Sequence, residues 1–138
     1  MKLELHHLNL CTSNVDAMDD FYRNVLELET EPTRNSNRIA TENSAGDYTG
    51  KVAFLTDGKT EMHLSERDLT IGFRQKQAIN PLERGHIAFR TSDMAAFKKH
   101  LEAKGIRYSD YGAWAMGGWY QIFFQDPDGN VIEVHQAT

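Results

Sequence analysis

The chain has 138 residues and a mass of 15.7 kDa, the length of one domain with a buried core. It carries 15 Lys and Arg against 20 Asp and Glu, and this net charge of −5 argues against binding to nucleic acid phosphates or anionic lipid. No apolar run reaches the roughly 18 residues of a membrane helix, and residues 1–10 lack the apolar core of a signal peptide. The single cysteine, Cys11, excludes an internal disulfide. We therefore expect a cytoplasmic globular domain without nucleic-acid or membrane partners.

The first half of the chain predicts a strand, a helix, a weak strand with a long loop, and a hairpin of two strands, over residues 3–11, 14–26, 32–46, 51–55 and 60–65. Asn14 or Asp16 can cap the helix. The apolar stripe expected on that helix consists of Val15, Met18, Phe21, Tyr22, Val25 and Leu26. Asp57-Gly58 is a strong signal for the hairpin turn.

The second half repeats this order after a connector over residues 67–80, which ends at Pro81. It predicts a strand, a helix, a short strand and a hairpin, over residues 86–90, 93–105, 106–108, 119–124 and 131–135. Asp93 can cap the helix and Gly105 can end it. Asp126-Pro127-Asp128-Gly129 forms the final turn.

The two halves also align residue by residue. The segment 7–13 lies over 86–92 without a gap, and 60–64 lies over 130–134. A repeated unit usually buries its apolar face against its copy. We therefore expect an α+β fold of two tandem βαβββ modules in one curled mixed sheet, forming a single domain over residues 1–138, with modules over about 1–66 and 85–138 and a connector over 67–84.

This alignment pairs four residues that can bind a metal. His7 and His86 open the first strand of each half, and His63 and Glu133 lie in the last strand of each half. Strand alternation turns them away from the apolar residues that should face the helices, namely Leu8, Leu10, Ile87, Phe89, Met62, Leu64, Ile132 and Val134. Imidazoles and a carboxylate that converge in this way predict a divalent metal site with a position open for substrate.

The other three histidines have weaker positions in this pattern. His6 points with the apolar side or sits at the strand start, His135 lies near the terminus, and His100 lies on a helix. We interpret all three as surface residues.

Four segments together resemble the vicinal oxygen chelate superfamily, which includes glyoxalase I, methylmalonyl-CoA epimerase, fosfomycin-resistance proteins and extradiol dioxygenases. They are His7-Leu-Asn-Leu, Phe21-Tyr22-Arg-Asn-Val-Leu-Glu-Leu, Gly85-His86-Ile-Ala-Phe and Asp126-Pro-Asp-Gly-Asn-Val-Ile-Glu. The resemblance covers nearly the whole chain. It implies paired βαβββ modules whose sheets curl around a metal, and a homodimer, because single-domain members commonly build the site across two subunits.

By position, the resemblance implies that His7, His86 and Glu133 are metal ligands. His63 falls where glyoxalase I has a Glu and the epimerase a Gln, so the set has one negative charge fewer than a two-glutamate site. The ion would be Ni, Co, Zn, Mn or Fe.

The chemistry implied is a lyase or isomerase reaction of glyoxalase type on a small molecule with vicinal oxygens, such as a glutathione adduct, with a metal-stabilised enolate. Glu133 would move the proton, with His63 as a second base. Two alternatives stay open: a metal-free small-molecule-binding protein of bleomycin-resistance type, and a non-haem iron dioxygenase. Phe123 stands where the dioxygenase pattern has a Tyr, and the Ser-rich loop of fosfomycin-type transferases is absent.

Four residues are candidates for contact with the substrate. Asn9 and Arg90 share the inner face with the ligands, and Arg90 either binds a substrate carboxylate or forms a surface ion pair. Trp119 provides an apolar wall or packs on the core or a dimer partner. Phe123 lies ten residues before Glu133 and completes this set.

Overall fold

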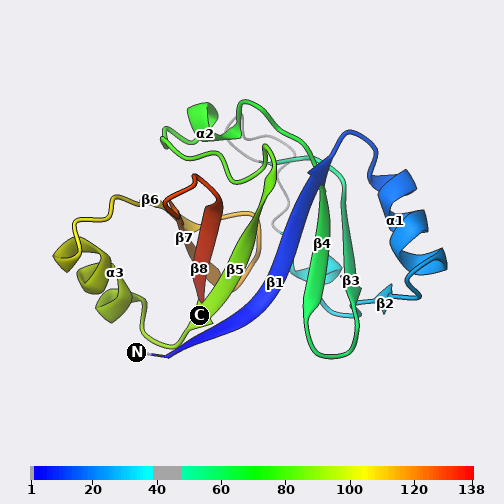
Figure 1. The fold of residues 1–138 in the computed structure, drawn as a ribbon, viewed down its shortest axis with the longest axis horizontal. Helices are drawn as coiled ribbons and strands as arrows, with labels where there is room; N and C mark the ends of the chain where they lie inside the picture. The colour runs from blue at the N-terminus through cyan, green and yellow to red at the C-terminus, as the bar shows by residue number, and fades with distance from the viewer. Residues whose placement is uncertain (1, 39–47) are drawn as a thin grey trace.

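The computed structural model describes residues 2–38 and 48–138 (Figure 1). The first half contains β1 (Leu3–Thr12), α1 (Val15–Asn24), β2 (Glu29–Thr30), β3 (Val52–Thr56) and β4 (Glu61–Glu66), with a 3-10 turn over Asn35–Asn37. The second half contains β5 (Gly85–Thr91), α3 (Met94–Ala103), β6 (Ser109–Ala113), β7 (Trp119–Gln125) and β8 (Val131–Ala137). The short helix α2 (Ile71–Arg74) lies in the connection between the halves.

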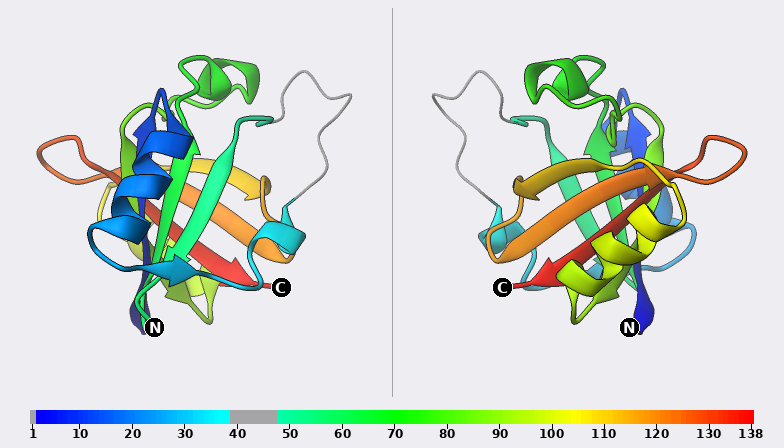
Figure 2. Two further views of the ribbon diagram at one scale, coloured as in Figure 1. Left: turned by 90° about the vertical axis from the view of Figure 1, so that its right-hand side faces the viewer. Right: turned by 90° about the vertical axis from the view of Figure 1, so that its left-hand side faces the viewer.

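The strands form one mixed sheet in the order β2-β3-β4-β1-β5-β8-β7-β6. β1 is parallel to β4 and β5 is parallel to β8, while β1 and β5 are antiparallel and join the two halves. The strands of the second half run at a steep angle to those of the first (Figure 2), and Phe54 of β3 packs in one cluster with Trp119 of β7. The predicted α+β fold with two βαβββ halves in a curled sheet is therefore confirmed.

The two long helices begin at the expected caps. The side chain of Asn14 accepts a hydrogen bond from the Ala17 N–H, and that of Asp93 accepts one from the Ala96 N–H. The helices lie on opposite flanks of the sheet (Figure 1). No helix in the described parts of the chain combines the length and the apolar composition needed to cross a membrane.

The prediction of a strand over 106–108 is wrong, because β6 starts at Ser109. Gly105 takes a left-handed φ of +70°, and the Ile106 N–H bonds back to the Leu101 carbonyl. This helix end uses the residues that a strand would need, and pairing with β7 begins only where Ser109 meets Phe123.

The apolar stripe expected on the first helix is only partly buried. Val15 packs against the sheet, but Phe21 is 49% exposed. The helix ends at Asn24, so Val25 and Leu26 lie beyond it and are exposed. The described part of the chain therefore leaves an apolar patch on this flank.

A second correction concerns the outer face of the central strand pair. Leu8 and Ile87 lie opposite one another in β1 and β5 and are exposed, not covered by helices. The helices pack over the flanks of the sheet, so they do not reach this pair. Leu10 and Phe89 do pack in the two helix-facing clusters, as expected.

The contact between the halves is tightest at Gly85, where β5 starts. Gly85 has a φ of +118°, and a Cβ at this position would fall against the backbone carbonyl of Asn9. Only glycine lets the two strands approach this closely. His86, the next residue, is thereby placed opposite Asn9.

Candidate metal centre

Three of the four paired residues meet on the inner face of the sheet. His7 comes from β1, His86 from β5 and Glu133 from β8, and their ligand atoms all lie within 4.8 Å of one another. The Glu133 Oε2 is 2.9 Å from the His86 Nε2 and 3.6 Å from the His7 Nε2. All three side chains are buried from solvent, at 1% exposure for His7 and for Glu133 and 6% for His86.

The hydrogen bonds of His86 show which of its nitrogens is available. Its Nδ1 lies 2.8 Å from the Pro81 carbonyl oxygen, which can only accept, so Nδ1 carries a proton. In a neutral ring the Nε2 then has a lone pair, and this lone pair faces the carboxylate of Glu133. Two acceptors 2.9 Å apart require a shared cation, either a second proton on His86 or a metal ion. The lone pairs of the His86 Nε2 and the Glu133 Oε2 therefore fit a bound metal ion.

The charges at the centre follow the same pattern. Burial lowers the pKa of His7 well below its ordinary value, and the adjacent His63 lowers it further. Burial by itself raises the pKa of Glu133, but the surrounding imidazoles outweigh burial and bring that pKa well below its ordinary value. Neutral imidazole and ionised carboxylate are the protonation states in which these groups bind divalent metals.

His63 lies beside the three residues but is engaged differently. Its ring stacks on His7 with 3.9 Å between centroids, and its Nε2 is 3.0 Å from the Glu61 Oε1. Burial lowers the pKa of His63, and Glu61 only partly opposes this effect. His63 does not belong to either group of described residues whose ligand atoms lie together. The structure therefore places it at the edge of the centre, as a neutral side chain.

The interpretation of His6 and His135 as surface residues is wrong. His135 is fully buried, and its Nδ1 is 2.8 Å from the Glu133 Oε1. His6 faces the site because the pairing of β1 with β5 shifts register between Leu5 and His7. This bulge turns two consecutive residues to one face, which strict alternation forbids. His100 is exposed on α3, as expected.

A cavity of about 50 Å³ adjoins the centre. Among its lining residues, Gln121 and Trp114 are 4% and 6% exposed, and each has a buried polar atom without a hydrogen-bond partner in the described chain, the Oε1 and the Nε1 respectively. The Gln121 Nε2 is 3.4 Å from the Glu133 Oε1. Buried polar atoms without partners are costly, so these two indicate contacts that a ligand would complete.

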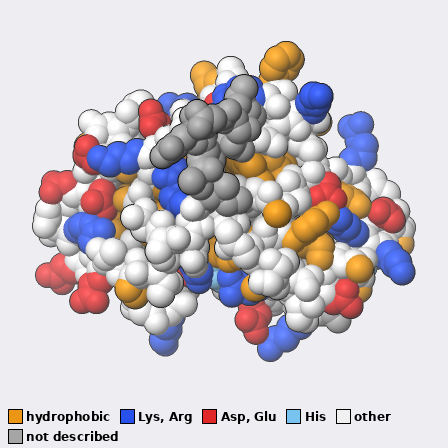
Figure 3. Space-filling model, turned by 180° about the vertical axis from the view of Figure 1, so that it is seen from behind, with side chains coloured by type: hydrophobic (Ala, Val, Ile, Leu, Met, Phe, Trp, Pro, Cys, Tyr) orange, Lys and Arg blue, Asp and Glu red, His pale blue; other side chains and the backbone are white. Residues whose placement is uncertain are grey.

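The remaining wall of this cavity is largely apolar and aromatic, with Val52, Phe54, Leu82, Met116 and Trp119 among its members. Seen from behind, orange hydrophobic surface and a small area of histidine lie near the middle of the molecule (Figure 3). A larger open groove of about 560 Å³ runs past Leu8 and Ile87. Its lining includes neither His7 nor Glu133, so we take the smaller cavity as the candidate site.

The four expected substrate contacts lie in different surroundings. Asn9 and Trp119 line the cavity, and Asn9 donates to the Ser65 Oγ at 2.8 Å. Phe123 is fully buried, with its ring 5.4 Å from that of His86, and it does not line the cavity. Arg90 is likewise absent from the lining.

The Arg90 Nε donates to the His135 Nε2 at 3.0 Å. Arg90 therefore contacts a side chain beside the centre, His135, and not the cavity.

Two residues that the sequence interpretation missed had a usable signal. Gln121 stands two residues after Trp119 and two before Phe123 on one strand, and Glu61 stands two residues before His63. Strand alternation therefore places both on the inner face. The mutual approach of Glu133 and His135 followed from the same rule.

Residues 4–134 match the family described as Glyoxalase/Bleomycin resistance protein/Dioxygenase superfamily. A curated protein of Arabidopsis thaliana, "Glyoxylase I 4", is 31% identical over 133 residues, which cover 94% of this chain and 68% of that protein.

Solved structures share the fold at lower identity. The hypothetical protein BH1468 from Bacillus halodurans C-125 superposes with a TM-score of 0.71 at 17% identity, covering 100% of this chain and 96% of the other. Methylmalonyl-CoA epimerase from Mycobacterium tuberculosis has a TM-score of 0.67 at 18% identity, covering 97% and 87%. These likenesses support the fold described above.

Proposed function

Because the chain belongs to the Glyoxalase/Bleomycin resistance protein/Dioxygenase superfamily, we propose that it is a metal-dependent enzyme of glyoxalase type. It would act as a lyase or isomerase on a small molecule with adjacent oxygen atoms. The observation that carries this proposal is the buried convergence of His7, His86 and Glu133 beside a cavity. The curated name of the Arabidopsis relative supports the same reaction class.

His7, His86 and Glu133 would hold the ion, which we expect to be Ni, Co, Zn, Mn or Fe. A divalent ion bound there would supply Lewis-acid polarisation of the substrate oxygens. His63 is neutral, and its Nε2 donates to the ionised Glu61, which leaves a lone pair on Nδ1. That lone pair can accept a proton from a carbon next to a carbonyl group. Glu133, the base that the sequence favours, is the other candidate.

The cavity limits the part of the substrate that is enclosed. At about 50 Å³ it is far smaller than the roughly 300–1,000 Å³ of pockets that enclose drug-sized ligands. Only the reacting end of a substrate would fit, and the bulk of a glutathione adduct would extend outside. Arg38 is the formally cationic residue of the lining and would attract an anionic group.

Assembly and location stay predictions. We expect a cytoplasmic homodimer, although one chain brings His7, His86 and Glu133 together by itself. A partner subunit is therefore not needed to supply these three side chains.

Metal content tests the proposal directly. The wild-type protein, stripped with chelator and reloaded with each candidate ion, should retain one ion per chain after gel filtration. Glu133→Gln keeps the side-chain volume but removes the charge, and its affinity should fall by more than the roughly 100-fold typical of losing an outer partner. His100→Gln, on the exposed face of α3, is the matched control. Equal metal retention by the wild type and Glu133→Gln would contradict the proposal.

Activity is tested by deuterium exchange at the carbon next to a carbonyl, followed by proton NMR in heavy water. The panel contains small 2-oxo acids, 2-hydroxy ketones and the hemithioacetal of glutathione with methylglyoxal. We expect exchange that requires metal. The double variant that carries both His63→Phe and Glu133→Gln should lose it. A metal-loaded wild type that exchanges none of these compounds contradicts the lyase or isomerase assignment.

One observation supports a second candidate, a non-haem iron oxygenase. Two imidazoles and one carboxylate, as in His7, His86 and Glu133, are also the ligand set of many Fe(II) oxygenases. Phe123, however, lies outside the cavity and has no hydroxyl group to orient a substrate. Oxygen consumption with catechols by the iron-loaded protein would favour this candidate.

A further inference from the structure

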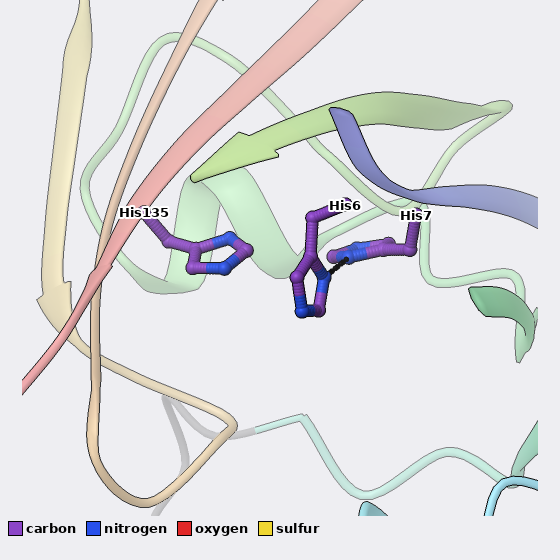
Figure 4. Close-up of side chains that lie close together, drawn as sticks. All are labelled: His6, His7 and His135. Atoms are coloured by element: carbon purple, nitrogen blue, oxygen red, sulfur yellow. Dashed lines mark hydrogen bonds between the residues drawn. The ribbon is translucent and has the colours of Figure 1, made fainter. Parts of the chain in front are cut away.

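A second group of imidazoles lies directly beside the metal centre. His6, His7 and His135 present ligand atoms within 4.8 Å of one another (Figure 4). The group shares His7 with the centre, and the rings of His6 and His135 are 4.7 Å apart, nearly perpendicular. Its composition alone suggests a second metal site.

The partners of His135 argue against a second ion. Its Nε2 accepts from the Arg90 Nε at 3.0 Å, and its Nδ1 is 2.8 Å from the Glu133 Oε1. Both ring nitrogens are therefore engaged, and a guanidinium beside the group repels a cation. The role of this group must lie in its hydrogen bonds.

A first series of hydrogen bonds joins Arg90, His135 and Glu133. Its direction follows from arginine, which can only donate. Because Arg90 donates to the His135 Nε2, that nitrogen is unprotonated and the proton of the neutral ring lies on Nδ1. The Nδ1–H then donates to the Glu133 Oε1. This leaves the Glu133 Oε2 directed at His86 and His7.

The ring of His135 is also held in place by stacking. It lies parallel to Trp119, with 4.1 Å between centroids and 3° between planes. The Arg90 guanidinium lies over the same indole, 5.5 Å from its centroid. The donor to Glu133 is therefore fixed in both tautomer and orientation.

The second series of hydrogen bonds starts from a carboxylate that can only accept. Glu61 receives two hydrogen bonds from Arg34 and keeps its charge, since these and the bond from His63 outweigh burial and hold its pKa below the ordinary value. The His6 Nε2 is 3.3 Å from the Glu61 Oε2 and must be its protonated nitrogen.

The Nδ1 of His6 is then an acceptor, and it lies 2.8 Å from the His7 Nδ1 (Figure 4). His7 must therefore donate from Nδ1, which leaves its Nε2 unprotonated on the side of Glu133. The opposite polarity would set the lone pair of the His6 Nε2 against the Glu61 carboxylate. It would also leave the His7 Nε2–H with an acceptor 3.6 Å away, too long for a hydrogen bond.

We infer that His6 and His135 are positioning residues: His6 fixes the tautomer in which His7 offers Nε2 to the metal, and His135 orients the carboxylate of Glu133. This inference rests on the proposed metal centre. Outer partners of this kind orient ligands and select the metal-binding tautomer. Arg90, which can only donate, fixes the direction of the hydrogen bonds through His135. Glu61, which can only accept, fixes the direction of those through His6 and His7.

The metal-free protein provides the first test. Long-range nitrogen-15 NMR of the histidine rings should show His7 and His135 each protonated at Nδ1. In Arg90→Met, Glu133 still requires a proton on the His135 Nδ1, so the tautomer should stay the same while the Nε2 signal shifts to that of a nitrogen that accepts no hydrogen bond. Protonation of His7 or His135 at Nε2 in the wild-type protein would overturn the inference, whatever the metal content.

Paired substitutions provide the second test, with Co²⁺ affinity measured by chelator competition and by the visible absorption of the bound ion. His6→Phe and His135→Phe keep a flat ring but remove the hydrogen bonds, and each should weaken Co²⁺ binding by about 10- to 100-fold. His6→Asn and His135→Asn place an amide near the former Nδ1 and should recover most of that loss. His100→Phe controls for the change to Phe, and thermal unfolding of each metal-free variant reports on folding.

The outcomes separate the inference from the proposed function. Wild-type affinity in both Phe variants, or equal loss in the Phe and Asn variants, contradicts the positioning role. A wild-type protein that binds no ion contradicts the proposed function, and the NMR result then decides the inference alone.

Discussion

The two halves of the chain carry the same pair of residue types, Glu followed two residues later by His, on equivalent strands, but the pair is shifted by two residues between them. On β4 the carboxylate of Glu61 stands two residues before the imidazole of His63, and on β8 Glu133 stands two residues before His135, so that the carboxylate takes the place of His63. Each strand forms its own imidazole–carboxylate contact, 3.0 Å in the first half and 2.8 Å in the second. The two aligned positions, 63 and 133, thus hold an imidazole in the first half and a carboxylate in the second.

This difference separates two tasks. The carboxylate of Glu133 faces the imidazoles of the first strands, whereas that of Glu61 accepts hydrogen bonds from Arg34 and His63 and lies 3.3 Å from the His6 Nε2. In the proposed centre, Glu133 would bind the metal ion, and Glu61 would hold the hydrogen-bond donors that lie behind the ligands. The two halves differ in their helices as well, since α3 buries Phe97 and α1 leaves Phe21 exposed.

The helices give the largest expected difference between the halves. Phe97 is 3% exposed and packs in the cluster under α3, so Phe97→Ala should cost about 4 kcal/mol of unfolding free energy through the cavity it leaves. Phe21 is 49% exposed, and Phe21→Ala should cost under about 1 kcal/mol. Urea unfolding of both variants measures the contrast. Equal losses would mean that α1 is as firmly packed as α3.

Changing His63, the counterpart of Glu133 in the first half, to a carboxylate should have the next largest effect. His63→Glu would put a second carboxylate beside Glu61 and remove its hydrogen-bond donor. We expect a loss of about 3 kcal/mol in the metal-free protein, typical of leaving a buried charge without compensation.

Two further variants sharpen that result. His63→Gln keeps an amide donor and should stay within about 1 kcal/mol of the wild type. Adding Glu61→Gln to His63→Glu removes the repulsion and should restore most of the stability in urea unfolding. If the double variant is no more stable than His63→Glu, repulsion from Glu61 is not the cause.

The smallest effect concerns pH. Burial lowers the pKa of His6 from 6.5 to about 3, so between these values the unfolded chain binds a proton at His6 and the native chain does not. The contribution of His6 to stability is therefore fully present above about pH 6.5 and is lost as the pH drops toward 3. The pKa values of His7 and His63 are also lowered by burial and act with the same sign.

Urea midpoints of the metal-free protein at about pH 7.5 and pH 5 check this sign. The midpoint should be lower at the acidic pH, and His6→Phe should show a smaller drop. His100→Gln should keep the wild-type drop. A midpoint that stays constant or rises on acidification would show that these rings are not buried in neutral form.

The fold was predictable because the sequence contains an internal repeat. Apolar alternation and the matching of 7–13 with 86–92 indicated both halves, and alternation placed His7, His86 and Glu133 on one face. The same rule failed at His6, since a bulge leaves no mark in a sequence where polar residues stand side by side. Burial of His135 depends on the stacked ring of Trp119, a contact between strands that composition does not reveal.

The distance between β1 and β5, and with it the distance between His7 and His86, depends on the backbone at Gly85. Any side chain there would collide with the Asn9 carbonyl, whereas Gly58, in the β3–β4 turn, has open space around its Cα. Every missense change in the codon for residue 85 would thus wedge β5 away from β1 and carry His86 off the other two ligands. The tolerance of the molecule to mutation is therefore low at a residue that has no side chain at all.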